Sequence, residues 1–237
     1  AEGMLPAMKG GWTRRTHRLL VLGLLGLVGL AVSLGPLRAE KQAEGSARRL
    51  SLVVLGDSLA AGHGVDPSEA FPAILQEWIR EAGYPFEVIA AAVSGDTTAG
   101  GVRRLGWVLR RPMDVLLLEL GGNDGLRGLS PAMTRSNLLT LVRQARERHP
   151  RVRVVLAGMQ MPPNMGEAYL EEFRMVYPEV ARETGASLIP HLLEGVGGRP
   201  EFNLPDLIHP TPEGHRRVAS NCWAVLKPVL EAAARDR

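Results

Sequence analysis

From residue 50 onward, short apolar runs alternate with longer segments in which apolar residues recur at helical spacing. This alternation leaves few folds open to the chain, because it assigns each segment to a strand or a helix. The runs that we expect to be strands are Leu50–Leu55, Phe86–Val93, Val115–Leu120, Val152–Ala157 and Ser187–Ile189. Strands separated by single helices form right-handed crossovers and a parallel sheet with helices on both faces. The pattern therefore predicts one α/β domain with a five-stranded parallel sheet.

Helix positions follow from apolar spacing and from start signals. Ser130-Pro131 and Thr211-Pro212 each place an N-cap hydroxyl before a proline, which is typical of a helix start. The residues at helical spacing are Phe71, Ile74, Leu75, Trp78 and Ile79; Tyr169, Phe173, Val176, Tyr177 and Val180; and Val218, Cys222, Val225, Leu226 and Val229. Each set forms one apolar stripe, so we expect three amphipathic helices packed on the sheet.

The first 39 residues differ from the rest in charge and hydropathy. Lys9 to Arg18 is positive, and residues 19–34 are rich in Leu, Gly and Val. A basic region followed by an apolar stretch of this length is typical of a secretory signal. Cleavage after Ala39 would place Leu37 where a small residue is preferred, so a retained membrane anchor stays open. We expect residues 1–39 to direct the protein to the periplasm or another extracytoplasmic site, with possible membrane contact. We expect residues 40–49 to form a flexible linker before the α/β domain of residues 50–237.

Charge and cysteine content exclude several classes of function. The sequence pI of about 9.4 reflects basic residues concentrated in residues 1–39, and the remainder is nearly neutral. A nearly neutral domain does not have the basic charge that is typical of nucleic-acid-binding proteins, so we expect no nucleic-acid partner. The single cysteine, Cys222, has no partner for an internal disulfide, and no Cys/His cluster has zinc-like spacing. We interpret Cys222 as a buried, inert thiol.

A serine directly follows the first expected strand, in Gly56-Asp57-Ser58. A serine hydroxyl is a poor nucleophile until a positioned base takes its proton, and that base works best when a third group orients it. The tripeptide is also common in plain turns, so it indicates catalysis only together with such partners.

Asp206 and His209 supply these partners near the C-terminus. At positions i and i+3, the carboxylate can accept from one imidazole nitrogen and leave the other free to take the proton of Ser58. Two alternatives stay open. In one, Asp206 caps a turn and His209 is a solvated loop residue. In the other, a metal is bound by ligands drawn from Asp206, His209, His191 and His215, but their spacing fits no standard site.

Two glycine-containing blocks follow the second and third expected strands. Ser94-Gly95-Asp96-Thr97 can offer the backbone N–H of Gly95, and Gly121-Gly122-Asn123-Asp124 can offer the side-chain amide of Asn123. Together with the N–H of Ser58, these groups describe an oxyanion hole with three donors. Plain turns are the alternative, because Gly, Asn, Asp and Ser are the usual turn residues.

The four blocks GDS at 56–58, SGDT at 94–97, GGND at 121–124 and DxxH at 206–209 resemble the SGNH, or GDSL, hydrolases over residues 50–230. The string LELGGNDGLRG at 118–128 is more narrowly similar to bacterial periplasmic acyl hydrolases with thioesterase, arylesterase and lysophospholipase activity. The resemblance implies a three-layer flavodoxin-like sandwich without metal or cofactor. It also implies that Ser58 is the nucleophile, His209 the base, Asp206 its orienter, and Ser58, Gly95 and Asn123 the oxyanion donors. His63, close to the nucleophile, has no assigned role.

We therefore expect a serine hydrolase, most simply a monomer, that cleaves small-molecule acyl esters or thioesters through an acyl-enzyme. The apolar residues Met159, Met161, Met165, Leu126 and Leu129 suit an acyl chain, although the methionines could equally pack the core. A carbohydrate O-acetyl esterase or acetyltransferase would need a polar cleft with aromatic platforms, and only 5% of the residues are aromatic. The non-enzymatic alternative is an anchored binding module of the same fold.

Overall fold

The computed structural model describes residues 49–236. The expected signal or anchor at residues 1–39 and all of the expected linker except Arg49 lie outside the described residues. Within residues 49–236, no helix combines the length and hydropathy that a bilayer span requires. The elements in chain order are β1 (Leu50–Gly56), α1 (Ser58–Ala61), η1 (Pro67–Glu69), α2 (Phe71–Glu81), β2 (Phe86–Ala92), α3 (Thr98–Val108), β3 (Val115–Glu119), α4 (Gly122–Leu126), α5 (Pro131–Arg148), β4 (Arg153–Ala157), η2 (Pro163–Met165), α6 (Glu167–Thr184), β5 (Ser187–Ile189) and α7 (Pro212–Arg235).

All five strands lie parallel in one sheet, in the order β2-β1-β3-β4-β5. This is the flavodoxin-like order, so the predicted fold class is confirmed. The five expected strands all form, and their ends differ from the expected ones by no more than one residue. The sheet order reverses between β1 and β3, and open α/β sheets bind ligands at that point, beyond the carboxyl ends of the strands.

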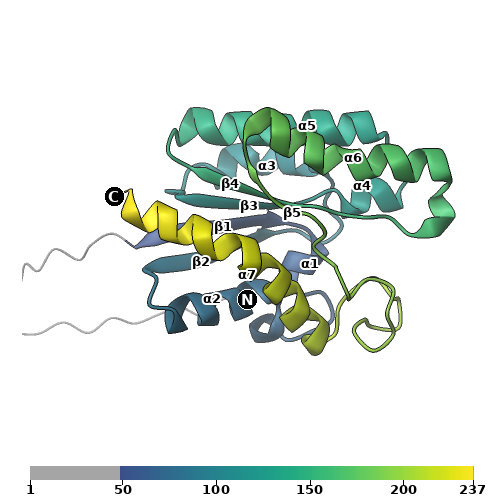
Figure 1. Ribbon diagram of the computed structural model, residues 1–237, viewed down its shortest axis with the longest axis horizontal. Coiled ribbons are helices and arrows are strands. Elements are labelled where there is room, and N and C mark those ends of the chain that lie inside the picture. Colours follow the sequence, from purple (N-terminus) through teal and green to yellow (C-terminus); the bar gives the residue numbers. More distant parts are fainter. Residues whose placement is uncertain (1–48, 237) are drawn as a thin grey trace, which may run out of the picture. The chain divides into compact units, whose positions relative to one another are not determined.

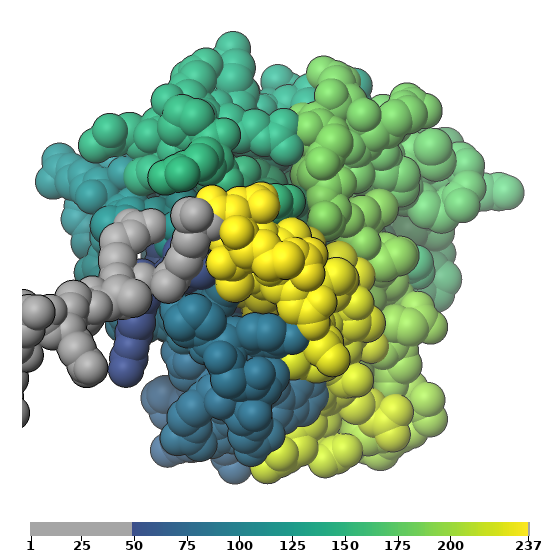
Figure 2. Space-filling model, turned by 60° about the vertical axis from the view of Figure 1, so that its left-hand side comes forward, coloured from purple at the N-terminus to yellow at the C-terminus, as the bar shows by residue number. Residues whose placement is uncertain are grey.

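Helices cover both faces of the sheet (Figure 1). Helices α3, α5 and α6 lie over one face, and α2 and α7 over the other. Figure 2 shows α7, in yellow, directly beside α2, in blue. Trp78 of α2 and Trp223 of α7 form an edge-to-face ring pair with centroids 6.1 Å apart. Because both faces are covered, every residue of β1 and β3 is buried.

The two expected helix starts differ in how they are capped. Thr211 caps α7, and its hydroxyl accepts from the N–H of Gly214 at 3.2 Å. Ser130 is the N-cap residue of α5, but the expected hydroxyl cap is absent, and its carbonyl accepts the N–H groups of Met133 and Thr134 instead. Cys222 is fully buried on the inner side of α7, and burial raises the pKa of its thiol, as expected of an inert cysteine.

Candidate active site

Ser58 lies at the turn where β1 passes into the short helix α1. The side chain of Asp57 caps this helix by accepting from the N–H of Leu59 at 3.0 Å. Gly56 is needed before the turn, because a Cβ there would lie 2.4 Å from Oε2 of Glu119 and 2.5 Å from Cβ of Ala60. The close packing beneath Gly56 fixes where the chain turns, and it leaves Ser58 half-buried at the carboxyl end of the central strand.

The structure brings Ser58, His209 and Asp206 together although 151 positions separate the serine from the imidazole. Nε2 of His209 lies 3.0 Å from Oγ of Ser58, and Nδ1 lies 2.6 Å from Oδ2 of Asp206. Partial burial alone would raise the pKa of Asp206, but hydrogen bonds from the His209 ring and from the N–H groups of His209 and Ile208 lower it to about 2. An ionised carboxylate can only accept, so Nδ1 carries the proton and Nε2 is free to accept from Ser58.

The segment that holds Asp206 and His209 has a hydrogen-bonded frame. An isolated antiparallel bridge joins Asn203 to Pro210, and the N–H of Leu204 donates to the carbonyl of His209 at 2.7 Å. The buried amide of Asn203 donates to the carbonyls of Val196 and Arg199. These contacts hold the loop after β5 in one conformation, which is what a site assembled on a loop requires.

The predicted oxyanion donors come from three neighbouring strand ends. Gly95 follows β2 with φ of +78°, and its carbonyl accepts from Nη2 of Arg127 at 3.0 Å. Asn123 lies in α4, where its Nδ2 donates to Oδ2 of Asp57 at 3.0 Å. That bond uses one of the two amide protons and fixes the orientation of the other. The buried carboxylate of Asp124 accepts from both the N–H and the hydroxyl of Thr98, which ties the Gly95 loop to α4.

A buried carboxyl under the serine turn was not singled out in the sequence. Glu119, at the end of β3, is fully buried, and its Oε2 accepts from the N–H of Asp57 at 3.0 Å. Its Oε1 has no hydrogen-bond partner among the described residues. Burial, together with the negative charge of Asp57, raises the pKa of Glu119 well above its usual range. Burial also raises the pKa of Asp57 to about 6, although hydrogen bonds from Leu59 and Asn123 oppose the shift. The sequence signal was a charged residue ending an otherwise apolar strand.

The raised pKa values of Asp57 and Glu119 predict that the free energy of unfolding depends on pH. A raised carboxyl pKa means that the folded state binds a proton more tightly than the unfolded state, so stability is lost as the pH rises through the folded-state pKa. We expect this pair to lose part of its contribution to wild-type stability between pH 5 and pH 8, because that interval includes the folded-state pKa of Asp57 near 6. His215, whose pKa is lowered, acts in the opposite direction in wild type and variant alike, so it cancels in their difference. Glu119→Gln should lose less stability over this interval, because the amide does not titrate and no longer competes with Asp57 for a proton. Urea unfolding at both pH values measures the difference, and an equal fall in both proteins contradicts the prediction.

Arg104 is a second residue that the motifs did not indicate. Its Nε lies 2.6 Å from Oδ2 of Asp96, and its two Nη atoms donate to the carbonyls of Ala91 and Gly56. One guanidinium therefore joins the ends of β1 and β2 to the loop that holds Gly95. Its planar fork of five donors suits such a junction. On the sequence it was one arginine of a helix among many, with no local signal.

Three other histidines considered above occupy separate positions. The ring of His63 lies 4.4 Å from that of His209, centroid to centroid, with its side chain exposed at the edge of the site. His191 pairs with Glu194 at 3.0 Å. His215 is buried in α7, where its Nδ1 accepts from the N–H of Phe71 and burial lowers its pKa to about 4. Within residues 49–236, no three His, Cys, Asp or Glu side chains are grouped closely enough to share a metal ion.

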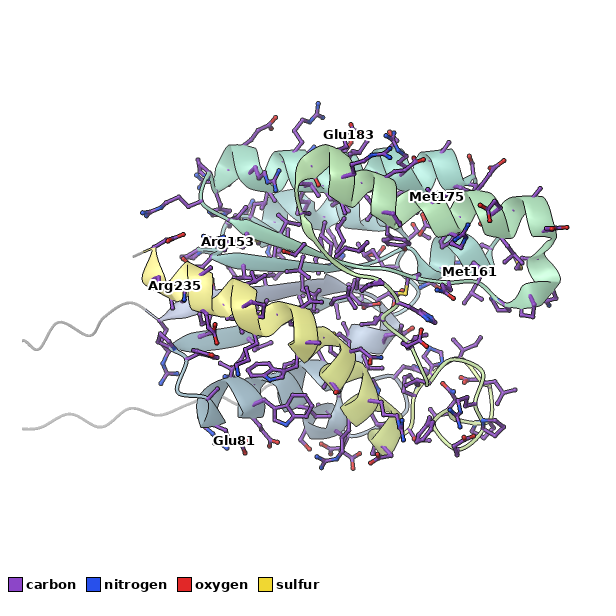
Figure 3. All side chains as sticks on the ribbon, in the orientation of Figure 1. Glu81, Arg153, Met161, Met175, Glu183 and Arg235 are labelled. Carbon is purple, nitrogen blue, oxygen red and sulfur yellow. The ribbon has the colours of Figure 1, made fainter. Side chains whose placement is uncertain are left out.

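A cavity of about 620 Å³ opens at Ser58. Besides Ser58, His209 and Asp206, its lining includes Leu126, Met159, Met161, Pro162, Pro163, Leu193, Leu207 and Ile208. Met161, labelled in Figure 3, packs closely against Gly125 of α4. Of the apolar residues expected around an acyl chain, Leu126, Met159 and Met161 therefore line the cavity, whereas Met165 and Leu129 do not. Met159 both lines the cavity and packs in the hydrophobic core, where it is buried.

Comparisons with known proteins concern the family and the fold of this chain. The model of the GDSL-like lipase/acylhydrolase family matches residues 54–217. The chain is 42% identical to the esterase TesA of Pseudomonas aeruginosa over 76% of its own length and 89% of that protein. It is 34% identical to thioesterase 1/protease 1/lysophospholipase L1 of Escherichia coli K12 over 76% of its length and 85% of the relative. A crystal structure of TesA superposes with a TM-score of 0.73 at 42% identity, over 76% of this chain and 99% of the other.

Proposed function

The chain belongs to the GDSL-like lipase/acylhydrolase family and is a GDSL-type esterase, and we propose that it cleaves acyl esters and thioesters with Ser58, His209 and Asp206 as a catalytic triad. The observation that carries the proposal is the continuous chain of contacts from Oγ of Ser58 to Nε2 of His209, and from Nδ1 of His209 to Oδ2 of Asp206. The same chain of contacts activates the nucleophile in serine hydrolases of unrelated fold.

The first step is attack on the carbonyl carbon by Oγ of Ser58, while Nε2 of His209 takes its proton. The carboxylate of Asp206 stabilises the imidazolium that forms. The tetrahedral oxyanion accepts hydrogen bonds from the N–H groups of Ser58 and Gly95 and from the amide of Asn123. Protonated His209 then donates its Nε2 proton to the leaving oxygen or sulfur, and the carbon–leaving-group bond breaks to form an acyl-serine.

The second step reverses these roles with water. Nε2 of His209 takes a proton from a water molecule, whose oxygen attacks the acyl-serine carbonyl, and the same three donors hold the second oxyanion. The intermediate then collapses, the ester bond to Ser58 breaks, and the imidazolium returns the proton to Oγ. The carboxylic acid leaves, and Ser58 and His209 return to their starting protonation states.

The cavity supports an acyl chain as substrate better than a sugar. Nine of its nineteen lining residues are Leu, Met, Pro or Ile, and none of the described lining residues is Phe, Tyr or Trp. An apolar cavity with a few convergent polar groups is what an acyl ester needs. A carbohydrate O-acetyl esterase or acetyltransferase would instead need a polar cleft with aromatic platforms.

A fluorophosphonate probe and an ester series test this proposal. The probe should label the unaltered protein at Ser58, which excludes a binding module that merely keeps the fold. p-Nitrophenyl esters from acetyl to palmitoyl, with acyl-CoA and lysophospholipid beside them, then define the substrate. Hydrolysis restricted to acetyl esters would contradict the acyl-chain assignment and favour an O-acetyl esterase.

Asn123→Ala should lower kcat about a hundred- to a thousand-fold, because losing one preorganised oxyanion donor costs about 3–4 kcal/mol of transition-state stabilisation. KM should change little, since this hydrogen bond strengthens in the transition state. Steady-state kinetics on one p-nitrophenyl ester measures both constants. Asn164→Ala serves as the control, because Asn164 is an exposed amide outside the cavity lining. A loss below about threefold in Asn123→Ala would mean that its amide does not face the oxyanion.

The basic and apolar character of residues 1–39 supports export to the periplasm or another extracytoplasmic location. Fractionation of cells that express the full chain tests this. Activity confined to the cytoplasm contradicts it, and activity in the membrane fraction favours a retained anchor over a cleaved signal.

A further inference from the structure

Leu207, between Asp206 and His209, has a backbone conformation that leucine rarely adopts. Its φ is +59°, and it is the only non-glycine residue with a positive φ among the described residues. In this left-handed region the Cβ of an L-residue crowds the following carbonyl oxygen, so the conformation is strained. Ten other described positions have a positive φ, and all ten are glycine. Leu207 therefore occupies a backbone conformation for which this chain otherwise uses glycine.

The loop requires this conformation whatever residue occupies position 207. The N–H of Leu207 donates to the carbonyl of Leu204 at 2.9 Å, which forms a turn with Pro205 at its second position. The N–H of Leu204 then donates to the carbonyl of His209, which closes the loop. Within it, Oδ1 of Asp206 accepts from the N–H groups of Ile208 and His209. A glycine at 207 would satisfy all of these bonds without strain, so the backbone does not explain the leucine.

Core packing does not explain it either. The side chain of Leu207 is 46% exposed and lines the cavity at Ser58. Ile208 and Leu126, at 42% and 40% exposure, line the same cavity, so the three form an apolar border from two separate elements. Leu207 is not part of the hydrophobic core, so its side chain stabilises the molecule by leaving water only when an apolar ligand covers it.

We propose that Leu207 determines substrate specificity by packing against the acyl chain of the bound substrate. This inference rests on the proposed function and adds a residue and a direction of preference to it. Each methylene that Leu207 helps to remove from water favours binding of the longer chain, and acetyl esters are too short to gain from it. The residue should therefore raise kcat/KM for medium and long acyl chains relative to acetyl.

The experiment compares p-nitrophenyl octanoate with p-nitrophenyl acetate, so that only the acyl chain differs. In Leu207→Gly, the ratio of their kcat/KM values should fall about tenfold, which corresponds to about two methylenes losing their cover. Activity on the acetyl ester should change by less than about threefold. The melting temperature should stay the same or rise, because the strain at φ +59° is relieved.

Two further variants keep the result interpretable. Leu207→Asn tolerates the left-handed backbone and keeps some of the bulk, but it presents an amide to the chain, so its ratio should also fall. Met133→Ala removes a side chain that is 60% exposed and outside the cavity lining, and its ratio should match that of the unaltered protein.

An unchanged octanoate-to-acetate ratio in Leu207→Gly overturns the inference, and so does an equal loss on both esters. A fall in melting temperature also overturns it, since Leu207 would then be a structural residue. If the unaltered chain hydrolyses neither ester, the proposed function fails and this inference with it. Activity with an unchanged ratio contradicts the inference alone.

Discussion

Ser58→Ala is expected to lower kcat for ester hydrolysis about a million-fold, and His209→Ala to lower it by a similar factor. The two residues act as one unit, because Oγ of Ser58 is nucleophilic only when Nε2 of His209, 3.0 Å away, takes its proton. Removing either one in a serine hydrolase triad costs about as much as removing both. The double variant should therefore be no slower than either single variant, within about threefold.

Stopped assays with a p-nitrophenyl ester at high enzyme concentration measure the residual rates, and the fluorophosphonate probe should no longer label Ser58→Ala. Ser68→Ala is a matched control, because Ser68 is exposed and its hydroxyl bonds only to Asp66 among the described residues. A loss of less than a hundredfold in Ser58→Ala would contradict the proposed nucleophile. Losses that multiply in the double variant would show that the two residues act independently.

Asp206→Asn is expected to lower kcat about ten-thousand-fold. The pKa of Asp206 near 2 keeps the carboxylate ionised across the working pH range, so it holds the proton on Nδ1 of His209. An amide nitrogen in its place would donate to Nδ1, which moves the ring proton to Nε2 and leaves no acceptor for the Ser58 proton. The loss should be smaller than that of His209→Ala, because the imidazole itself remains.

Asp206→Ala separates orientation from loop structure. It removes the acceptor for His209 and also the acceptor for the N–H groups of Ile208 and His209, whereas asparagine can keep the latter two bonds. We expect both variants to be slower than wild type and faster than His209→Ala, in kcat measured on one ester across pH 5 to 9. Equal losses in Asp206→Ala and His209→Ala would contradict the role of Asp206 as the residue that orients the base.

Much of the fold could be predicted from local pattern. The runs at Leu50–Leu55 and Val115–Leu120 are short and apolar at nearly every position, which is typical of a strand buried on both faces. Single helical segments between the runs then require a parallel sheet. The residues after β1, β2 and β3 necessarily meet at one edge, because parallel strands end on the same side. Ser58, Gly95 and Asn123 could therefore be predicted from the sequence as oxyanion donors of one site.

Other features had no local signal. The link from Asn123 to Asp57 spans 66 positions, and the bonds from Arg104 to Gly56 and Ala91 join three separate segments. Glu119 was placed in a strand, but its burial under the serine turn depends on the register between Gly56 and Glu119. The hydroxyl cap expected from Ser130 does not form, because the backbone carbonyl there provides the bonds instead.

The amino-acid sequence alone determined which segments are strands, which side chains could supply the nucleophile, base and carboxylate, and which family the motifs resemble. Those properties depend on residue type, on local spacing and on the order of the motifs along the chain. The tertiary structure alone decided that the His209 ring lies within hydrogen-bond distance of Ser58 and that Leu207 has a strained backbone beside the cavity. It also decided that Glu119 is buried with one oxygen unpaired among residues 49–236. Each of these features depends on how loops close between distant segments. The free energy of loop closure depends on contacts across the whole fold, so no single segment of the sequence predicts it.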